Sequence, residues 1–490
     1  MNFEAKGKFM KIFGLLLIML ITLSFNTELS ANDINVKNVR LSGQVNDSHT
    51  FVNFDLSWDN SWRNSTNYDA AWLFVKYKVG TGEWMHATLS ATPTDHTAPT
   101  GSTISPASDG KGVFIYRSAE GTGNNDFADV LLRWNYNSDG VANDAQLTVK
   151  VFAIEMVYIP QGSFSVGDGV SEKRFHAAGD TLATFTITTE QAITLNDTIT
   201  INPNPASLWA TGDMETGTGV IPAGFPKGYQ AFYLMKYEVT QGQYTEFLNM
   251  LTSTQANQRY APFTTGRYTI TGTYPLFTTN RPARACNFLA SSDGAAYADW
   301  AALRPITEFE FEKAARGTAS PVAGEYAWGN TNIDITGDLS GDEDGTETVT
   351  GGINCNHGIN FSNGDGGNGP VRSGIFAATT NTREGSGGSF YGVMEMSGNM
   401  WETVVTSGLE ASRSFQGTHG DGLLASNGNA TNSDWPGFSG GTVSTNGGVG
   451  GRGGGFQNTQ LRLRISQRFY MNVGAVREWS NGYRAGRTAE

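Results

Sequence analysis

Apolar and polar residues alternate in short runs through the first third of the chain. Phe54, Leu56 and Trp58 occupy alternate positions in one run, and Leu147 and Val149 do so in a later one. Alternation with a period of two, interrupted by Gly, Asp and Asn, is typical of β-strands that bury one face. The runs cover residues 36–45, 51–58, 71–79, 112–117, 129–135 and 146–154. They predict an Ig-like β-sandwich of about seven strands over residues 32–155.

Helical signals are few. Thr240 is a suitable N-cap for a helix in which apolar residues recur three and four positions apart between Tyr244 and Leu251. Thr307 with Glu310 has the spacing of a capping box, in which each side chain accepts from the other residue's free backbone amide. A third short helix is expected near residues 295–300.

Composition favours a loop-rich, strand-rich chain. The 490 residues include 61 glycines and 11 tryptophans, and only 16% are charged. This mixture argues against disorder and against long amphipathic helices. Residues 331–389 and 408–450 are rich in Gly, Asn, Asp, Ser and Thr and are expected to form long loops. The predicted fold class is therefore α+β, with a β-sandwich at the N-terminal end.

Charge narrows the choice of partners. The net charge is −13, and no block of Lys or Arg occurs beyond the N-terminus. A chain of this kind lacks the positive surface that binds nucleic acid or an anionic membrane. We therefore expect neither as a partner.

The N-terminus has the pattern of a secretory signal. Lys6, Lys8 and Lys11 precede an apolar run over residues 12–25, and Ala31 ends a small-residue cleavage motif. The run is short for a membrane span, so removal is expected rather than anchoring. The sequence predicts a signal peptide over residues 1–31 and a bacterial protein exported to the periplasm, the cell surface or the medium. After removal of the signal we expect no membrane span.

The chain has two cysteines, Cys286 and Cys355. In an exported protein they could form one disulfide, and as free thiols they would be small buried hydrophobic residues. The sequence leaves both alternatives open.

Several strings follow one another in a fixed order in the last two thirds of the chain. They are MVYIPQGSFSVG at 156–167, RPITEFEFEKAARG at 304–317, YAWGN at 326–330, GVMEMSGNMWE at 392–402, GRGGGF at 451–456 and Gly482-Tyr483-Arg484. Together they resemble the core of the formylglycine-generating-enzyme, or sulfatase-modifying-factor, family. The resemblance implies such a domain over residues 156–490, with a variant of the C-type-lectin-like fold that tolerates long loops.

The resemblance fails at the residues that carry the family's chemistry. In its oxidases, two cysteines five residues apart follow the Gly-Gly-aromatic run and hold copper while a sulfatase cysteine is converted to formylglycine. Counting from Phe456 places Asn458 and Leu463 at these positions. Neither side chain is a soft donor for cuprous copper. We therefore expect no copper.

The resemblance also implies calcium. Carried over to this chain, the ligands of one site are Glu395, the carbonyls of Gly398 and Met400, and Glu402. Oxygen ligands in a flexible loop are what calcium prefers. The family has Asp or Asn at the first of these positions, so Glu395 is a departure. The alternative is that these residues form a turn and part of the core without metal.

A second calcium site is implied at Asn356, His357, Asp365 and Gly367. The surrounding segment is full of Asn and Gly. A solvated turn is the alternative at this place.

Two functions compete. The first is an exported, non-catalytic protein of this fold that binds an unknown protein or glycan ligand or acts in envelope assembly. Its ligand-binding residues, carried over from the surface where the oxidases seat their peptide, are Trp401, Gln457, Asn458, Gln460 and Arg462. The second is a formylglycine-generating oxidase, or a related non-haem iron or copper enzyme, that acts on sulfatases. The missing cysteine pair favours the first.

Overall fold

The computed structural model describes residues 34–177, 180, 182–196, 207–210, 219–333, 338–340, 348–350, 354–358, 368–377, 382–471, 474 and 476–490. The expected signal peptide at 1–31 lies outside these residues, as do Asp365 and Gly367 of the second expected calcium site. Among the described helices, none is both long enough and apolar enough to cross a membrane.

The N-terminal part is a sandwich of two β-sheets. Strands β1, β2 and β7 form a three-stranded sheet, and β3, β5, β6 and β8 belong to a seven-stranded sheet with β4 paired at its side. Each run of alternating residues noted in the sequence coincides with one of these strands. The strands are β1 (Asn35–Val45), β2 (His49–Arg63), β3 (Asp69–Val79), β4 (Met85–His86), β5 (Ser102–Pro106), β6 (Val113–Arg117), β7 (Gly121–Trp134) and β8 (Leu147–Ile159).

Strand β3 is buried on both faces. Successive side chains of a strand point to opposite sides. Leu73 and Val75 therefore face the core between the two sheets, while Trp72 and Phe74 belong to a second core on the other side. Both faces are apolar, as expected of a strand covered on each side.

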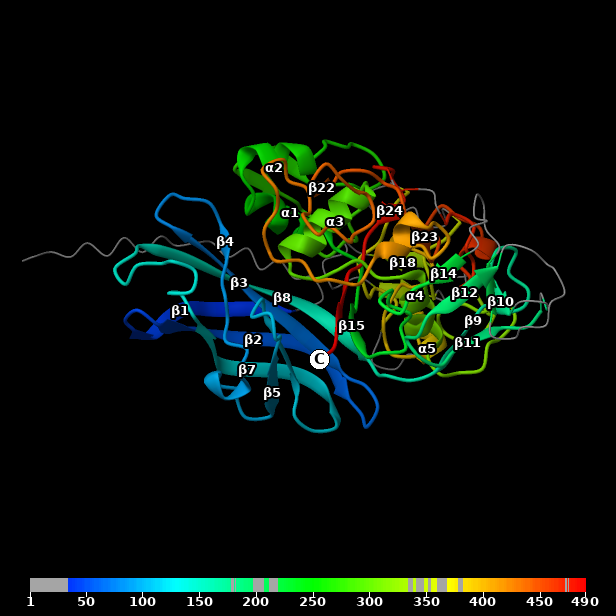
Figure 1. The fold of residues 1–490 in the computed structure, drawn as a ribbon, viewed down its shortest axis with the longest axis horizontal. Coiled ribbons are helices and arrows are strands. Elements are labelled where there is room, and N and C mark those ends of the chain that lie inside the picture. The colour runs from blue at the N-terminus through cyan, green and yellow to red at the C-terminus, as the bar shows by residue number, and fades with distance from the viewer. Residues whose placement is uncertain are drawn as a thin grey trace, which may run out of the picture.

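The second core is covered by helices. α1 (Gln241–Asn249) and α3 (Ser291–Trp300) lie over the seven-stranded sheet (Figure 1). Phe74 of β3 meets Trp300 of α3 edge to face at 5.2 Å between ring centroids, and Phe247 of α1 meets Trp300 at 5.4 Å. The seven-stranded sheet is thus a middle layer between the smaller sheet and the helices.

The same sheet continues into the C-terminal part. β15 (Phe232–Met235) pairs with β8, and β25 (Gly486–Thr488) pairs with β15. The boundary expected between residues 155 and 156 therefore lies inside β8, which runs through it without interruption. One strand serves both parts of the molecule.

Two expected helix starts are confirmed. Thr240 and Gln243 form a capping box at the start of α1, and Thr307 and Glu310 form one at the start of α4 (Glu308–Arg316). The expected helix near residues 295–300 is α3. The other helices are α2 (Ser253–Arg259) and α5 (Arg383–Ser386), with 3₁₀ turns η1 (Pro93–Asp95), η2 (Ala411–Ser414) and η3 (Gln460–Arg462).

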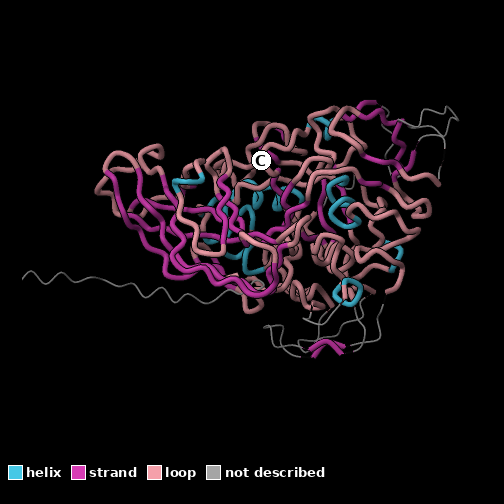
Figure 2. Tube along the Cα trace, turned by 90° about the horizontal axis from the view of Figure 1, so that it is seen from below, coloured by secondary structure: helices cyan, strands magenta, loops and turns pink. Residues whose placement is uncertain are grey.

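Loops, drawn in pink in Figure 2, predominate in the C-terminal part, and its strands are short. The remaining strands are β9 (Phe164–Val166), β10 (Phe175–Ala177), β11 (Phe185–Ile187), β12 (Ile193–Asn196), β13 (Ser207–Ala210), β14 (Gly219–Ile221), β16 (Thr271–Thr273), β17 (Leu276–Thr278), β18 (Asp338–Ser340), β19 (Thr348–Thr350), β20 (Trp401–Val405), β21 (Phe438–Ser439), β22 (Thr442–Val443), β23 (Val449–Arg452) and β24 (Asn481–Gly482). The described structure is therefore α+β, rich in strands and loops.

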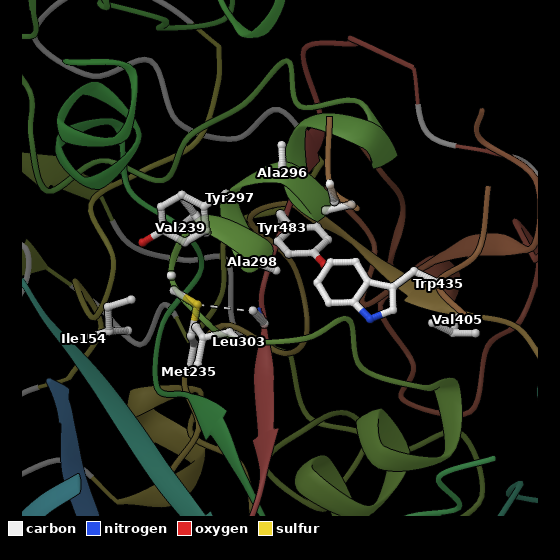
Figure 3. Packing of buried hydrophobic residues seen from close by; sticks show 14 of the residues in the cluster. Ile154, Met235, Val239, Ala296, Tyr297, Ala298, Leu303, Val405, Trp435 and Tyr483 are labelled. Carbon is white, nitrogen blue, oxygen red and sulfur yellow. Dashed lines mark hydrogen bonds between the residues drawn. The ribbon is translucent and has the colours of Figure 1, made fainter. Parts of the chain in front are cut away.

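Tyr483, close to the C-terminus, packs in the core beside α3 (Figure 3). A Cβ atom added at Gly294 would lie 2.1 Å from the Tyr483 ring, so only glycine allows α3 to approach this closely. Two residues on, the Ala485 amide donates to Met235 Sδ of β15 at 3.4 Å. These contacts hold the final strand against the sheet.

Helix α4 holds the following segments through buried ion pairs. Arg468 donates to both carboxylate oxygens of Glu308 at 2.6 and 2.9 Å, and Arg452 of β23 donates to Glu312 at 2.8 Å. All of these side chains are fully buried. A buried charge is tolerated only with a partner. The pairs therefore anchor β23 and the segment around Arg468 at fixed positions.

Candidate ligand-binding site

Strand β20 forms the centre of the candidate site. It lies between β23 and β24 in a three-stranded sheet, with Thr403 opposite Gly451 and Trp401 opposite Asn481. Trp401 and Thr403 share one face of the strand because they are two residues apart. Glu402 points to the other face, into the interior.

A pocket of about 320 Å³ opens on the Trp401 face. Its volume is at the lower end of the range for ligand sites in proteins. The described residues that line it are Trp401, Thr403, Gly451, Gln457, Tyr470, Gly474, Val476, Glu478, Ser480 and Asn481.

Two perpendicular aromatic rings form one wall. Trp401 and Tyr470 meet edge to face at 4.9 Å between centroids. Trp401 is only 6% exposed, whereas Tyr470 is 36% exposed. Gly451 lies against the Trp401 ring, because a Cβ atom added there would be 3.1 Å from Cε3. A larger residue at 451 would push the indole aside.

The polar lining is largely uncharged. Gln457 Nε2 donates to Ser480 Oγ at 2.8 Å, and Asn481 Nδ2 donates to the carbonyl of Val476 at 2.9 Å. These bonds orient both amides. Glu478, at the exposed edge, supplies the one carboxylate among the described lining residues.

Comparison with known proteins identifies the scaffold around this pocket. A family model described as "Sulfatase-modifying factor enzyme 1-like domain" matches residues 144–488. The chain belongs to this family. The match begins just before β8, the strand shared by both parts of the molecule.

Among solved structures, this chain is similar to "Treponema denticola variable protein 1". The match covers 69% of this chain and 96% of the other, with 14% sequence identity and a TM-score of 0.32. No curated protein matches the chain.

The two residues that counting from Phe456 places at the family's cysteine positions have structural roles here. Asn458 Oδ1 accepts from the Gly455 amide at 2.8 Å and stabilises the turn after the glycine run. Leu463 is fully buried in a core cluster with Val404 and Ile465. Neither residue lines the pocket.

Both cysteines are free and buried in separate cores. Cys286 and Cys355 therefore do not form the disulfide that the sequence allowed. Burial raises the pKa of each thiol above its ordinary value. The reactive thiolate form is disfavoured at both positions.

The five expected ligand-binding residues fall into two groups. Trp401 and Gln457 line the pocket. Asn458 holds the turn, Gln460 is exposed in η3, and Arg462 stacks on the Phe469 ring 3.2 Å from its centroid. The sequence therefore predicted two residues of the pocket lining, Trp401 and Gln457.

The opposite side of the pocket comes from residues 474–481. Val476, Glu478, Ser480 and Asn481 line it. They carry no motif, and only their distance from Trp401 in space makes them relevant. Sequence reasoning had no signal for them.

In the first expected calcium set, both carboxylate oxygens of Glu402 already accept hydrogen bonds from a cation. Arg484 donates to both carboxylate oxygens of Glu402 at 2.9 and 2.7 Å. Glu395 accepts from the Gly374 amide at 2.6 Å through Oε1, while Oε2 is buried without a hydrogen bond among the described residues. A calcium ion would have to displace the guanidinium, so this set, as folded, does not fit the metal.

Protonation lowers the charge of this acidic group further. Glu238 accepts from the Met400 amide at 3.0 Å and lies near Glu402. Burial, together with repulsion by Glu402, raises the pKa of Glu238. Burial raises the pKa of Glu395 to about 7. Arg484 and bound protons thus compensate the carboxylates.

Of the second expected calcium set, Asn356 and His357 are buried. Asn356 Nδ2 donates to the carbonyl of Gly369 at 3.1 Å. Asp365 and Gly367 lie outside the described residues, so this site stays a prediction. Within the described part of the chain, no three His, Cys, Asp or Glu residues are grouped as metal ligands.

Proposed function

We propose that this chain is an exported, non-catalytic member of the sulfatase-modifying-factor family that binds a ligand in the pocket beside Trp401. The observation that carries the proposal is that no cysteine follows the glycine run at 451–456, where counting places Asn458 and Leu463 at the family's cysteine positions. Binding and envelope assembly need a shaped surface and no redox metal.

The thiol chemistry of the oxidases has no substitute in this chain. Cuprous copper is held by soft thiolate ligands. Cys286 and Cys355 are the only cysteines in the sequence. Both are buried with raised pKa values, in different cores. A pair of thiolates at one site would require a different fold around them.

The pocket itself supports a binding role. It combines aromatic rings with amide and hydroxyl groups, as ligand sites generally do. β23, which contributes Gly451 to the lining, is anchored to α4 through Arg452 and Glu312. A pre-organised pocket loses little entropy when its ligand binds.

The activity test uses the full mature chain, copper and a sulfatase peptide containing Cys-x-Pro-x-Arg. Mass spectrometry measures conversion of the peptide cysteine to the aldehyde. We expect none above a protein-free control. Catalytic aldehyde formation that disappears in Cys286→Ser or Cys355→Ser would overturn the proposal and establish the oxidase alternative.

The binding test compares what co-purifies with the parent chain and with Gly451→Val. The added side chain would meet Trp401 and narrow the pocket. We expect a small molecule or glycan bound to the parent to be lost from the variant while both proteins remain folded. Equal retention by both would place binding elsewhere.

A further inference from the structure

The charge of the pocket restricts its ligand. Glu478 is the one acidic side chain among the described lining residues, and no Lys or Arg lines the pocket there. The neighbouring positions 472, 473 and 475 are Asn, Val and Ala and add no charge. The whole chain carries a net charge of −13. An anionic ligand would therefore enter a negative field without a counter-ion.

Hydrogen-bonding groups are dense and mostly neutral. Thr403 and Ser480 present hydroxyls, and Gln457 and Asn481 present amides whose orientation is set by the bonds described above. Each amide has one N–H committed and keeps its oxygen for another donor. The Glu478 carboxylate accepts strong hydrogen bonds from hydroxyl groups. A ligand with several adjacent hydroxyls satisfies such a lining.

The aromatic wall requires an apolar surface on the same ligand. Tyr470 is the exposed ring of the pair, and Trp401 supports it edge-on. A pyranose ring has an apolar face of C–H groups and a rim of hydroxyls. It can pack on Tyr470 and bond to the amides and hydroxyls at the same time.

An extended peptide is a poorer match. Peptides bind sheets by adding a strand to a free edge. β20 has β23 on one side and β24 on the other, and the Gly451 amide of β23 donates to the carbonyl of Tyr470. At this site the backbone therefore offers no row of free groups, and recognition depends on side chains.

We infer that the pocket between Trp401, Tyr470 and Asn481 binds a neutral saccharide. The inference rests on the proposed binding function and specifies its ligand class. The volume of about 320 Å³ suits one sugar residue or a short stretch of a chain.

The test is titration calorimetry on the full mature chain. The neutral probes are di- to tetrasaccharides of glucose, galactose, mannose and N-acetylglucosamine. Oligogalacturonate serves as the acidic probe, and chitosan oligomers and an Arg-containing peptide serve as cationic probes. We expect at least one neutral oligosaccharide to bind and the acidic probe to fail.

Variants locate the binding. Tyr470→Ala and Gln457→Ala are each expected to weaken it about tenfold, which corresponds to about 1.4 kcal/mol. The control is Tyr274→Ala, since Tyr274 is 41% exposed in the turn between β16 and β17 and lines no part of the pocket. It should leave the affinity unchanged.

The outcomes separate this inference from the proposed function. Binding of only charged probes, sensitive to Tyr470→Ala, would overturn the saccharide class and leave a binding function intact. Saccharide binding that ignores both pocket variants would overturn the site. Failure of every neutral probe at millimolar concentration also overturns the inference. Catalytic aldehyde formation in the earlier assay, lost in Cys286→Ser or Cys355→Ser, would overturn the proposed function itself.

Discussion

The shared sheet makes a strong prediction about cooperativity, which Trp72→Ala tests. Trp72 is fully buried on the face of β3 that meets the helices. Its Nε1 donates to the carbonyl of Ala301 at 2.9 Å, and Arg487 lies over its ring at 4.5 Å. The side chain therefore joins β3 to the end of α3 and to β25.

The expected loss is large. Replacing a buried tryptophan by alanine costs about 3–5 kcal/mol. Leaving the carbonyl of Ala301 without its donor adds about 1–3 kcal/mol. Because the two contributions overlap, we expect the free energy of unfolding to fall by about 4–6 kcal/mol. Typical totals of about 5–15 kcal/mol make this a severe destabilisation.

Trp134→Ala is the matched control. Trp134 is also fully buried and also donates through Nε1, to Asp139 at 2.6 Å, but it faces the core between the two sheets. If β3 and β8 unite both cores, urea unfolding of the parent followed by fluorescence and circular dichroism should give one transition. Both variants should shift this transition.

Hydrogen exchange supplies the second readout. Trp72→Ala should speed exchange in β8 and α3 together. Two separate transitions in the parent chain, or a loss below 1 kcal/mol in Trp72→Ala, would refute the reasoning. Faster hydrogen exchange confined to the three-stranded sheet in Trp134→Ala would also refute it.

Further predictions concern the buried acidic residues and calcium. Burial raises the pKa of Glu395 from its ordinary value of 4.5 to about 7, so between these pH values the folded chain holds a proton that the unfolded chain has released. The free energy of unfolding should fall as pH rises through this range, by up to about 1.4 kcal/mol per pH unit, and Glu395→Gln should flatten the slope in urea unfolding at pH 5 to 8. Glu402→Gln breaks the buried pair with Arg484 and should lower the free energy of unfolding by about 3–5 kcal/mol. Asp129→Asn breaks an exposed pair with Arg40 and should lower it by only about 0–1 kcal/mol. Similar losses in the two variants would contradict the role of burial. We expect calcium to raise the melting temperature by binding at the second predicted site. Asp365→Ala should abolish this rise, and Glu395→Gln should leave it in place. If calcium does not raise the melting temperature above that of an EDTA control, the second site is excluded.

Local sequence patterns determined the elements that depend on near neighbours. The capping boxes at Thr240 and Thr307 involve residues three positions apart, and they form as expected. The alternation that placed β2 and β8 reflects which face of each strand is buried. Alternation predicted that β3 buries one face, whereas the fold covers both of its faces.

Partners distant in the chain were not predictable in this way. The family resemblance implied that Glu402 is a calcium ligand, yet the fold brings Arg484 to it from 82 positions away. Lining residues such as Glu478 and Asn481 join Trp401 only because β24 pairs with β20. The family strings indicated the scaffold and one side of the pocket.

The amino-acid sequence by itself determined six strands of the N-terminal part, two helix caps, the family and the absence of a cysteine pair, since each of these depends on residue types at short spacing. Only the tertiary structure decided that β8 belongs to both parts of the molecule, that Arg484 neutralises Glu402 and that largely uncharged groups line the pocket beside Trp401. The physical reason is that pairing and burial join groups far apart in the chain, and their energies depend on which surfaces finally meet.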